Sequence, residues 1–160
     1  METPLSAASQ IAIATLKERA PEAFELAGSF KAAGFRLALV GGTVRDALLN
    51  RLGNDLDFTT DAKPEDSKKI LKKFADETWD VGIKFGTIGA KRSDTTFEVT
   101  TYRADSYEAD TRKPEVQFGD NIEDDLRRRD FTVNAMAIEL TTDTPEFIDP
   151  YNGVTDLLKK

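Results

Sequence analysis

Two aspartates separated by one residue are the first feature of this sequence that could carry chemistry. Asp55 and Asp57 flank Leu56 in DLDFTT, where acidic and apolar residues alternate as they do in a strand. An extended backbone sends alternate side chains to one face, so both carboxylates would lie together, opposite Leu56. Paired carboxylates suit Mg²⁺ or Mn²⁺, because Mg²⁺ is usually held by one or two carboxylates with substrate phosphates and water. The alternative is a solvent-exposed pair without a ligand.

A third carboxylate, Glu98, lies in the segment TFEVTTYR. Phe97 and Val99 would occupy the opposite face of that strand, so a neighbouring strand could present Glu98 beside Asp55 and Asp57. Three such groups would suit two metal ions about 3.5–4 Å apart. Alternatively, Glu98 is the cross-strand partner of a nearby lysine or arginine.

A glycine pair in LVGGTVRD follows an apolar run and precedes a predicted helix. Free backbone amides and the positive end of the helix dipole at Gly42 could bind a phosphate chain. Arg45, one turn into the helix, could add a guanidinium fork. The alternative is that Gly41 and Gly42 only allow a tight turn between strand and helix.

The segment DDLRRRDFTVNA is the third candidate. Its three consecutive arginines span most of a helical turn, so at most two of them face a common site. Guanidinium groups bind phosphate bidentately, and Asp130 or Asn134 could orient an arginine or reach a sugar hydroxyl. Alternatively, the arginines form ion pairs with Asp124 and Asp125.

Composition narrows the chemistry that these groups can perform. The chain has 160 residues, 39% of them hydrophobic, which predicts about one domain with a substantial core. It contains no cysteine and no histidine. Disulfides, zinc fingers and nucleophile systems built on histidine or cysteine are therefore excluded. Any metal must be bound by oxygen, which favours hard cations.

The charge is negative and uneven. The net charge is −7, and residues 104–125 contain eight acidic and two basic side chains. Because binding of nucleic-acid phosphates needs clustered Lys and Arg, we do not expect this chain alone to bind RNA tightly. No signal-peptide pattern and no apolar stretch of about 18 residues occur, so we expect a cytoplasmic protein that does not contact the membrane.

Hydrophobic spacing and turn residues predict the elements that position these groups. Helices are expected at 8–19, 22–33, 43–50 and 64–74, and strands at 35–40, 55–60, 87–91 and 96–102, the last two joined at Ser93-Asp94. We expect a long loop over 104–120 with a short strand at 116–118. A helix from 122 that passes into a strand, a turn in FIDPYNG and a helix from near Gly153 follow. These elements predict an α+β fold with a mixed, mostly antiparallel sheet of about five strands flanked by helices.

Five segments in a fixed order together resemble a known family. They are LVGGTVRDALL, DLDFTT, FEVTTYR, DDLRRRDFTVNAMA and IDPYNGVTDL. The chain resembles the class II tRNA nucleotidyltransferases and bacterial poly(A) polymerases from about residue 25 to 160. The resemblance implies a polymerase-β-like nucleotidyltransferase head at 25–146, after an N-terminal helical segment at 1–24. Residues 147–160 would begin the helical neck, so that the remaining neck, body and tail, including the segment that selects the base, lie outside this sequence.

The resemblance also implies a role for each candidate residue. Asp55 and Asp57 would be the metal ligands. Glu98, which the strand alternation and not the resemblance places beside them, completes the expected catalytic set. The nucleotide would be bound by the following residues: Gly42, Arg45, Arg129, and the supporting Arg128, Asp130 and Asn134. The segment after Tyr102 is similar to a flexible loop implicated in switching between nucleotide additions.

The implied reaction is template-independent addition of CMP, CMP and AMP to the 3′ end of tRNA. An RNA 3′-hydroxyl would attack the α-phosphorus of CTP or ATP and release pyrophosphate, with two Mg²⁺ or Mn²⁺ ions bound. Contacts to tRNA are expected mainly from the regions that this sequence lacks, so the isolated head is expected to have low activity. Two alternatives stay open, namely a poly(A) polymerase with the same chemistry and a non-catalytic nucleotide-binding domain.

Overall fold

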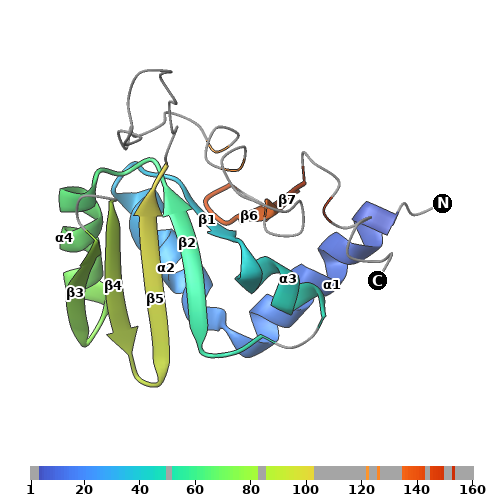
Figure 1. The fold of residues 1–160 in the computed structure, drawn as a ribbon, viewed down its shortest axis with the longest axis horizontal. Coiled ribbons are helices and arrows are strands. Elements are labelled where there is room, and N and C mark those ends of the chain that lie inside the picture. The colour runs from blue at the N-terminus through green and yellow to red at the C-terminus, as the bar shows by residue number, and fades with distance from the viewer. Residues whose placement is uncertain are drawn as a thin grey trace, which may run out of the picture.

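A single mixed β-sheet is the framework of the computed structural model, which describes residues 4–49, 52–82, 86–102, 122, 126, 135–142, 145–149 and 153 (Figure 1). Within these residues, seven strands occur in the order β3-β4-β5-β2-β1-β6-β7. β2 and β5 run parallel, and the neighbouring pairs on either side of them are antiparallel. The strands are β1 Leu37–Val40, β2 Asp55–Thr60, β3 Glu77–Gly82, β4 Thr87–Arg92, β5 Thr95–Thr101, β6 Ala137–Glu139 and β7 Glu146–Ile148.

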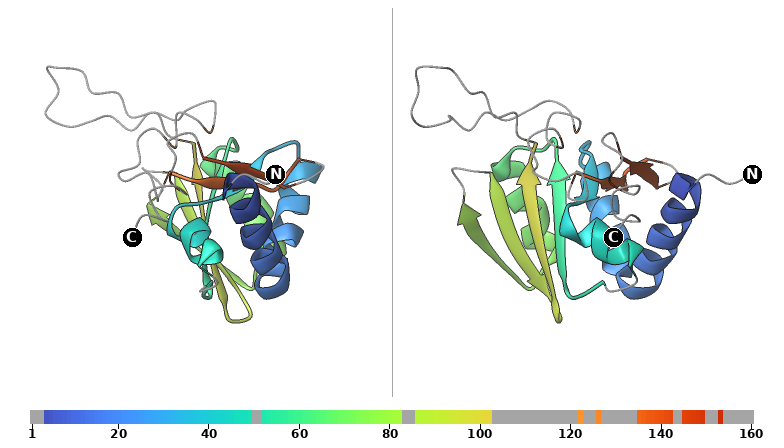
Figure 2. Two further views of the ribbon diagram at one scale, coloured as in Figure 1. Left: turned by 90° about the vertical axis from the view of Figure 1, so that its right-hand side faces the viewer. Right: turned by 45° about the vertical axis from the view of Figure 1, so that its right-hand side comes forward.

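Four helices of the described chain pack around this sheet, namely α1 Pro4–Arg19, α2 Pro21–Ala32, α3 Gly42–Leu48 and α4 Pro64–Phe74. α2 and α4 lie behind the sheet in Figure 1, and α1 lies beside α2 and α3 (Figure 2). α4 begins at Pro64, has acidic residues in its first turn and basic residues in its last, which complements the helix dipole. None of the helices among the described residues combines the length and hydropathy that a transmembrane span requires.

The two faces of the sheet differ in polarity. The face against α2 and α4 carries the main apolar core, which includes Leu26, Phe30, Leu37, Leu39, Leu56, Phe58, Leu71, Ile88, Phe97 and Val99. The opposite face has a smaller apolar cluster at β1 and β6, where Ala38 and Val40 pack with Ile122, Leu126 and Ala135. On β2 and β5 this second face carries polar side chains, so the chemistry predicted for this part of the chain lies on the face opposite α2 and α4, which we call the open face.

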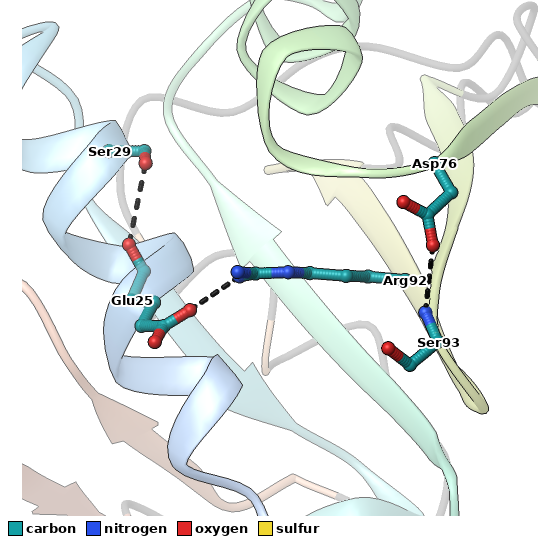
Figure 3. A network of polar contacts seen from close by, with 5 residues as sticks. All are labelled: Glu25, Ser29, Asp76, Arg92 and Ser93. Carbon is teal, nitrogen blue, oxygen red and sulfur yellow. Dashed lines mark hydrogen bonds and ion pairs between the residues drawn. The ribbon is translucent and has the colours of Figure 1, made fainter.

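A polar network attaches the turn between β4 and β5 to the helices (Figure 3). The Arg92 guanidinium donates to Glu25 on α2 and lies 4.5 Å from the ring centroid of Phe74 on α4. At the turn itself, the Ser93 amide donates to the Asp76 carboxylate over 3.0 Å. Ser93 has a φ of 55°, in the left-handed region, as a tight hairpin turn requires. The ends of β4 and β5 are thereby fixed relative to the core.

Most predicted elements are confirmed, and the expected count of about five strands is too low. The four helices, the four central strands and the turn at Ser93-Asp94 are present, although α1 begins at Pro4 and α3 already at Gly42. β3 was not expected. Its apolar residues Trp79 and Val81 are exposed and its register shifts between Asp80 and Gly82, so its sequence does not show the alternation of a half-buried strand. β7 was wrongly assigned to the turn in FIDPYNG. The strand expected after the helix from 122 is present as β6, and all three of its residues are buried.

Several expectations fall partly or wholly outside the described residues. Those wholly outside are the loop at 104–120 and its short strand at 116–118. Ile122 and Leu126 are helical, as expected for the segment that precedes β6, and Gly153 is helical as well. The expected boundary between residues 24 and 25 falls inside α2. Because α1, α2 and the sheet share one apolar core, the N-terminal helices pack as part of the same unit.

Glu139 provides a prediction about the pH dependence of stability. It is 4% exposed on β6, and burial raises the pKa of its carboxyl above the ordinary 4.5, although the Thr141 hydroxyl donates to it and Arg36 opposes the rise. A carboxyl with a raised pKa in the folded state contributes stability that is complete at low pH and is lost as the pH rises through that pKa.

The variant Glu139→Gln cannot ionise, and its amide oxygen can still accept from Thr141. We expect its free energy of unfolding, relative to the wild type, to increase as the pH rises above about 4.5. Urea unfolding at a series of pH values measures this difference. Glu77→Gln, at an exposed position of β3, is the matched control and should show no such trend. A difference for Glu139→Gln that stays constant with pH would contradict the assignment.

Candidate active site

The strand register brings three carboxylates together on the open face of the sheet. In the parallel pair of β2 and β5, Asp55 lies opposite Thr96 and Asp57 lies opposite Glu98. Residues directly opposite in neighbouring strands share a face, so Asp55, Asp57 and Glu98 point to the same side. Leu56 is 1% exposed on the other side, in the apolar core. The alternation expected from the sequence therefore occurs at both strands.

These side chains line a cavity of about 310 Å³, whose walls among the described residues are Asp55, Leu56, Asp57, Thr96 and Glu98. Asp55 is exposed, whereas Asp57 and Glu98 are half-buried. The floor of the cavity is the sheet itself, so the positions of the carboxylates are fixed by backbone hydrogen bonds of two central strands. A small polar ligand could reach all three groups from solvent.

The electrostatics of Glu98 show that negative charge accumulates here. Burial raises the pKa of the Glu98 carboxyl, and the charge of Asp57, a side-chain hydrogen bond with Asp57 and the charge of Asp55 raise it further. The cross-strand neighbours of Glu98 are Asp57 on β2 and Gly89 on β4. Neither is basic, so the alternative in which Glu98 pairs across the strands with lysine or arginine is wrong.

The donor set fits a hard divalent cation held by the aspartate pair. Within the described part of the chain, no group of three or more acidic side chains is arranged so that all of them could hold one ion. Mg²⁺ needs only one or two carboxylates when substrate phosphates and water complete its shell. Two oxygen ligands on one face, beside a third acid that raises the local negative charge, match that requirement.

The glycine pair forms the turn from β1 into α3. Gly41 has φ 68° and ψ −141°, a conformation that is essentially restricted to glycine. Its carbonyl accepts from the amides of Val44 and Arg45 over 3.1 and 3.3 Å, and its amide donates to the Met136 carbonyl over 3.4 Å. The structure therefore confirms the tight-turn interpretation for Gly41.

Gly42 is covered by the side chain of Arg45. A Cβ atom at Gly42 would lie 3.1 Å from Nη2 of Arg45, closer than side chains normally tolerate. The Arg45 Nε also lies 3.4 Å from a carboxylate oxygen of Asp46, and the Arg45 side chain is 38% exposed. The guanidinium is thus held over the turn, at the surface, where an anion could reach it.

Thr43 connects this turn to the carboxylates, and the sequence analysis missed it. Its hydroxyl accepts a hydrogen bond from the Asp57 amide over 3.0 Å, and the residue is 4% exposed. This bond fixes the start of α3 against β2. The Gly41-Gly42 turn and the aspartate pair are therefore parts of one site. The signal available in the sequence was a small hydroxyl residue directly after the glycine pair.

The predicted nucleotide residues Arg128, Arg129, Asp130 and Asn134 lie outside the described residues. Ile122 and Leu126 precede them and Ala135 follows them, and all three pack in the small apolar cluster with Ala38 and Val40. Ala38 lies opposite Thr59, which shares a face with Asp57. Leu126 and Ala135 therefore both lie on the face that carries the carboxylates.

Comparisons with known proteins agree with this arrangement. Residues 37–160 match the family model described as the poly A polymerase head domain. A CCA-adding enzyme of Enterococcus faecalis is 42% identical over 146 residues, covering 91% of this chain and 34% of its own length. The chain thus spans about a third of the length of such relatives.

Two solved structures share the fold. The Bacillus stearothermophilus CCA-adding enzyme in complex with CTP has a TM-score of 0.70 and 36% identity, covering 86% of this chain and 31% of the other. A tRNA nucleotidyltransferase complexed with a primer tRNA and an incoming ATP analogue has a TM-score of 0.66 and 31% identity, covering 83% of this chain and 36% of the other.

Proposed function

This chain belongs to the poly(A) polymerase head-domain family, and we propose on that basis that it is the catalytic head of a template-independent RNA nucleotidyltransferase. The proposed reaction is addition of CMP, CMP and AMP to the 3′ end of tRNA from CTP and ATP. The observation that carries the proposal is the set of three carboxylates on β2 and β5, connected to the glycine turn through Thr43. The 42% identical relative named as a CCA-adding enzyme supports the choice of reaction.

Asp55 and Asp57 would hold Mg²⁺ or Mn²⁺, with Glu98 as the third acidic group. When bound, the metal supplies Lewis-acid stabilisation of charge on phosphoryl oxygens and lowers the pKa of the attacking hydroxyl. The protein's own contribution is placement, because the sheet fixes the three acids and the Thr43 hydrogen bond fixes the turn relative to Asp57. Such placement of reacting groups supplies much of the rate enhancement in phosphoryl transfer.

The triphosphate would lie on the α3 side of the carboxylates. The amide of Gly42 and the guanidinium of Arg45 would bind its oxygens, in keeping with the preference of arginine for phosphate. Arg129 would contact the nucleotide from the segment between Leu126 and Ala135, supported by Arg128, Asp130 and Asn134. The position of Leu126 and Ala135 on the open face supports this location.

The 3′-hydroxyl of the RNA would then attack the α-phosphorus in line with the leaving pyrophosphate. The new bond joins the RNA 3′-oxygen to the α-phosphorus, and the bond from that phosphorus to the bridging oxygen of pyrophosphate breaks. We place the head at residues 25–146, with α1 and the start of α2 packed onto it and residues 147–160 beginning a neck. Most contacts to the body of the tRNA would come from regions beyond the head.

A poly(A) polymerase with the same chemistry is the second candidate, and the description of the matching family model favours it. Product length separates the two. The chain, in excess over a labelled tRNA that lacks its terminal CCA, is supplied with CTP, ATP and Mg²⁺. CCA addition gives products that stop three nucleotides longer and need CTP, whereas poly(A) synthesis gives long products from ATP alone. Absence of any extension, with or without CTP, would contradict the proposed function.

A further inference from the structure

Trp79 is an exposed aromatic side chain on the same face of the sheet as the carboxylates. It is the only tryptophan of the chain and is 37% exposed. Trp79 on β3 lies opposite Gly89 on β4, and Gly89 lies opposite Glu98 on β5. Since directly opposite residues share a face, this row runs from Trp79 to the carboxylate cavity. Figure 1 shows β3, β4, β5 and β2 side by side in this order.

The indole of Trp79 lies over Gly89. A Cβ atom at position 89 would be 2.4 Å from Nε1 of the indole and 2.9 Å from its Cζ2, so even an alanine would displace the ring. Neighbouring strands are about 4.8 Å apart, which places Gly89 only one strand away from Glu98. The absence of a side chain at Gly89 therefore lets the indole lie over β4, between β3 and the strand that carries Glu98.

The ring lies on one side of the cavity, and the glycine turn lies on the other. The turn at Gly41-Gly42 and Arg45 follows β1 and is bound to β2 through Thr43, whereas Trp79 is reached from β2 by crossing β5 and β4. In an in-line displacement the attacking oxygen and the leaving group are on opposite sides of the phosphorus. If the triphosphate occupies the side of the turn, the attacking hydroxyl approaches from the side of Trp79.

We propose that Trp79 is a positioning residue that stacks on the 3′-terminal base of the acceptor RNA and so directs its 3′-hydroxyl into the carboxylate cavity. This inference rests on the proposed function. Stacking of bases on aromatic side chains is a common and sequence-tolerant way of binding single-stranded RNA. It suits an acidic chain, because a stacked base is neutral and brings no phosphate onto the carboxylates.

The test uses the tryptophan itself as the probe. A short single-stranded RNA that ends in a 3′-terminal CC is titrated into the chain with Mg²⁺ at low ionic strength. We expect saturable quenching of the indole emission. Affinity for the RNA is measured separately by anisotropy of a 5′-label. For Trp79→Ala we expect about tenfold weaker RNA binding and a KM for RNA raised by a similar factor, with the KM for CTP unchanged.

Three further variants separate stacking from a structural role. Trp79→Phe and Trp79→Tyr keep an aromatic ring and should restore most of the affinity. Gly89→Ala keeps Trp79 but displaces its ring, so RNA binding should weaken here too. Val81→Ala is the matched control, because Val81 is an exposed apolar residue (48%) of the same strand, and it should change nothing. Thermal unfolding of each variant identifies any loss of fold.

Either of two binding results would overturn the inference. One is equal RNA affinity in the wild type and in folded Trp79→Ala. The other is quenching of the wild type by CTP alone to the same extent, which would place the base of the nucleotide on Trp79. If the wild type extends tRNA and Trp79→Ala does so with the same KM for RNA, this inference fails and the proposed function stands. If the wild type transfers no nucleotide, the proposed function fails, and the RNA-binding comparison still decides the role of Trp79.

Discussion

Replacement of Asp57 by asparagine is expected to lower nucleotide transfer by about a thousandfold or more and to leave the fold intact. The reason is that Asp55 and Asp57 are the only acidic residues of β2, the strand that the Thr43 hydrogen bond attaches to the glycine turn. A bound metal contributes several kcal/mol of charge stabilisation in the transition state, and each 1.4 kcal/mol or so corresponds to a tenfold change in rate. Asp55→Asn should have an effect of the same order.

The stability of Asp57→Asn and Asp55→Asn, unlike their activity, should not decrease. Asp55, Asp57 and Glu98 raise the local negative charge, as the raised pKa of Glu98 indicates. Removal of one charge relieves repulsion in the absence of metal, so the free energy of unfolding should stay the same or increase. Single-turnover transfer of labelled CMP and urea unfolding measure the two effects on the same preparations.

Asp66→Asn is the matched control for this pair. Asp66 is an aspartate in the first turn of α4, and α4 packs on the face of the sheet opposite the carboxylates. The substitution should leave transfer unchanged and lower the free energy of unfolding by about 0.3–1 kcal/mol, because a negative charge near the start of a helix interacts favourably with the helix dipole. Transfer by Asp57→Asn within tenfold of the wild type would show that these carboxylates are not the metal ligands.

Substitution of Gly41 by alanine is the second large effect that we expect. The backbone there, with φ 68° and ψ −141°, lies in a region that costs a residue with a side chain about 1–3 kcal/mol. Because the Gly41 carbonyl accepts from the amides of Val44 and Arg45 in the first turn of α3, relief of that strain would shift the start of the helix. We therefore expect a loss of about 1–3 kcal/mol of stability and about tenfold weaker binding of CTP.

Gly34→Ala distinguishes strain from function. Gly34 also has a positive φ, 89°, and a Cβ there would meet no atom within 4 Å. It follows α2, which packs on the face of the sheet opposite the carboxylates. Urea unfolding should show a loss of stability for both variants, while calorimetric titration should show weaker CTP binding for Gly41→Ala only. Unchanged CTP affinity in a folded Gly41→Ala protein would mean that the glycine pair is a turn without a role in binding.

The sequence was informative where chemistry and local periodicity coincide. DLDFTT combines strand alternation with two acids, so both the strand and the common face of Asp55 and Asp57 followed from the pattern. The glycine pair between an apolar run and a helical pattern likewise predicted the turn into α3. These features depend on neighbouring residues alone, which is why they could be predicted without knowledge of the fold.

Features that depend on long-range register could not be predicted in the same way. The alternation in TFEVTTYR predicted the face of Glu98 and allowed it to lie beside the aspartates. Its place opposite Asp57 depends on the parallel pairing of β2 and β5, which no local pattern specifies. The same holds for Thr43 and Asp57, and for Trp79 and Gly89, whose contact requires the register of β3 and β4. β3 and β7 are at the two edges of the sheet, where exposed residues weaken the alternation by which strands are recognised.

The most direct test of the central claim is calorimetric titration of the chain with CTP, with and without Mg²⁺, for the wild type and for the double variant Asp55→Ala/Asp57→Ala. If Asp55 and Asp57 hold the metal that binds the triphosphate, the wild type binds CTP more tightly with Mg²⁺, and the double variant shows no such increase. Equal dependence on Mg²⁺ in both proteins, or CTP binding by the wild type that does not respond to Mg²⁺, would contradict the account.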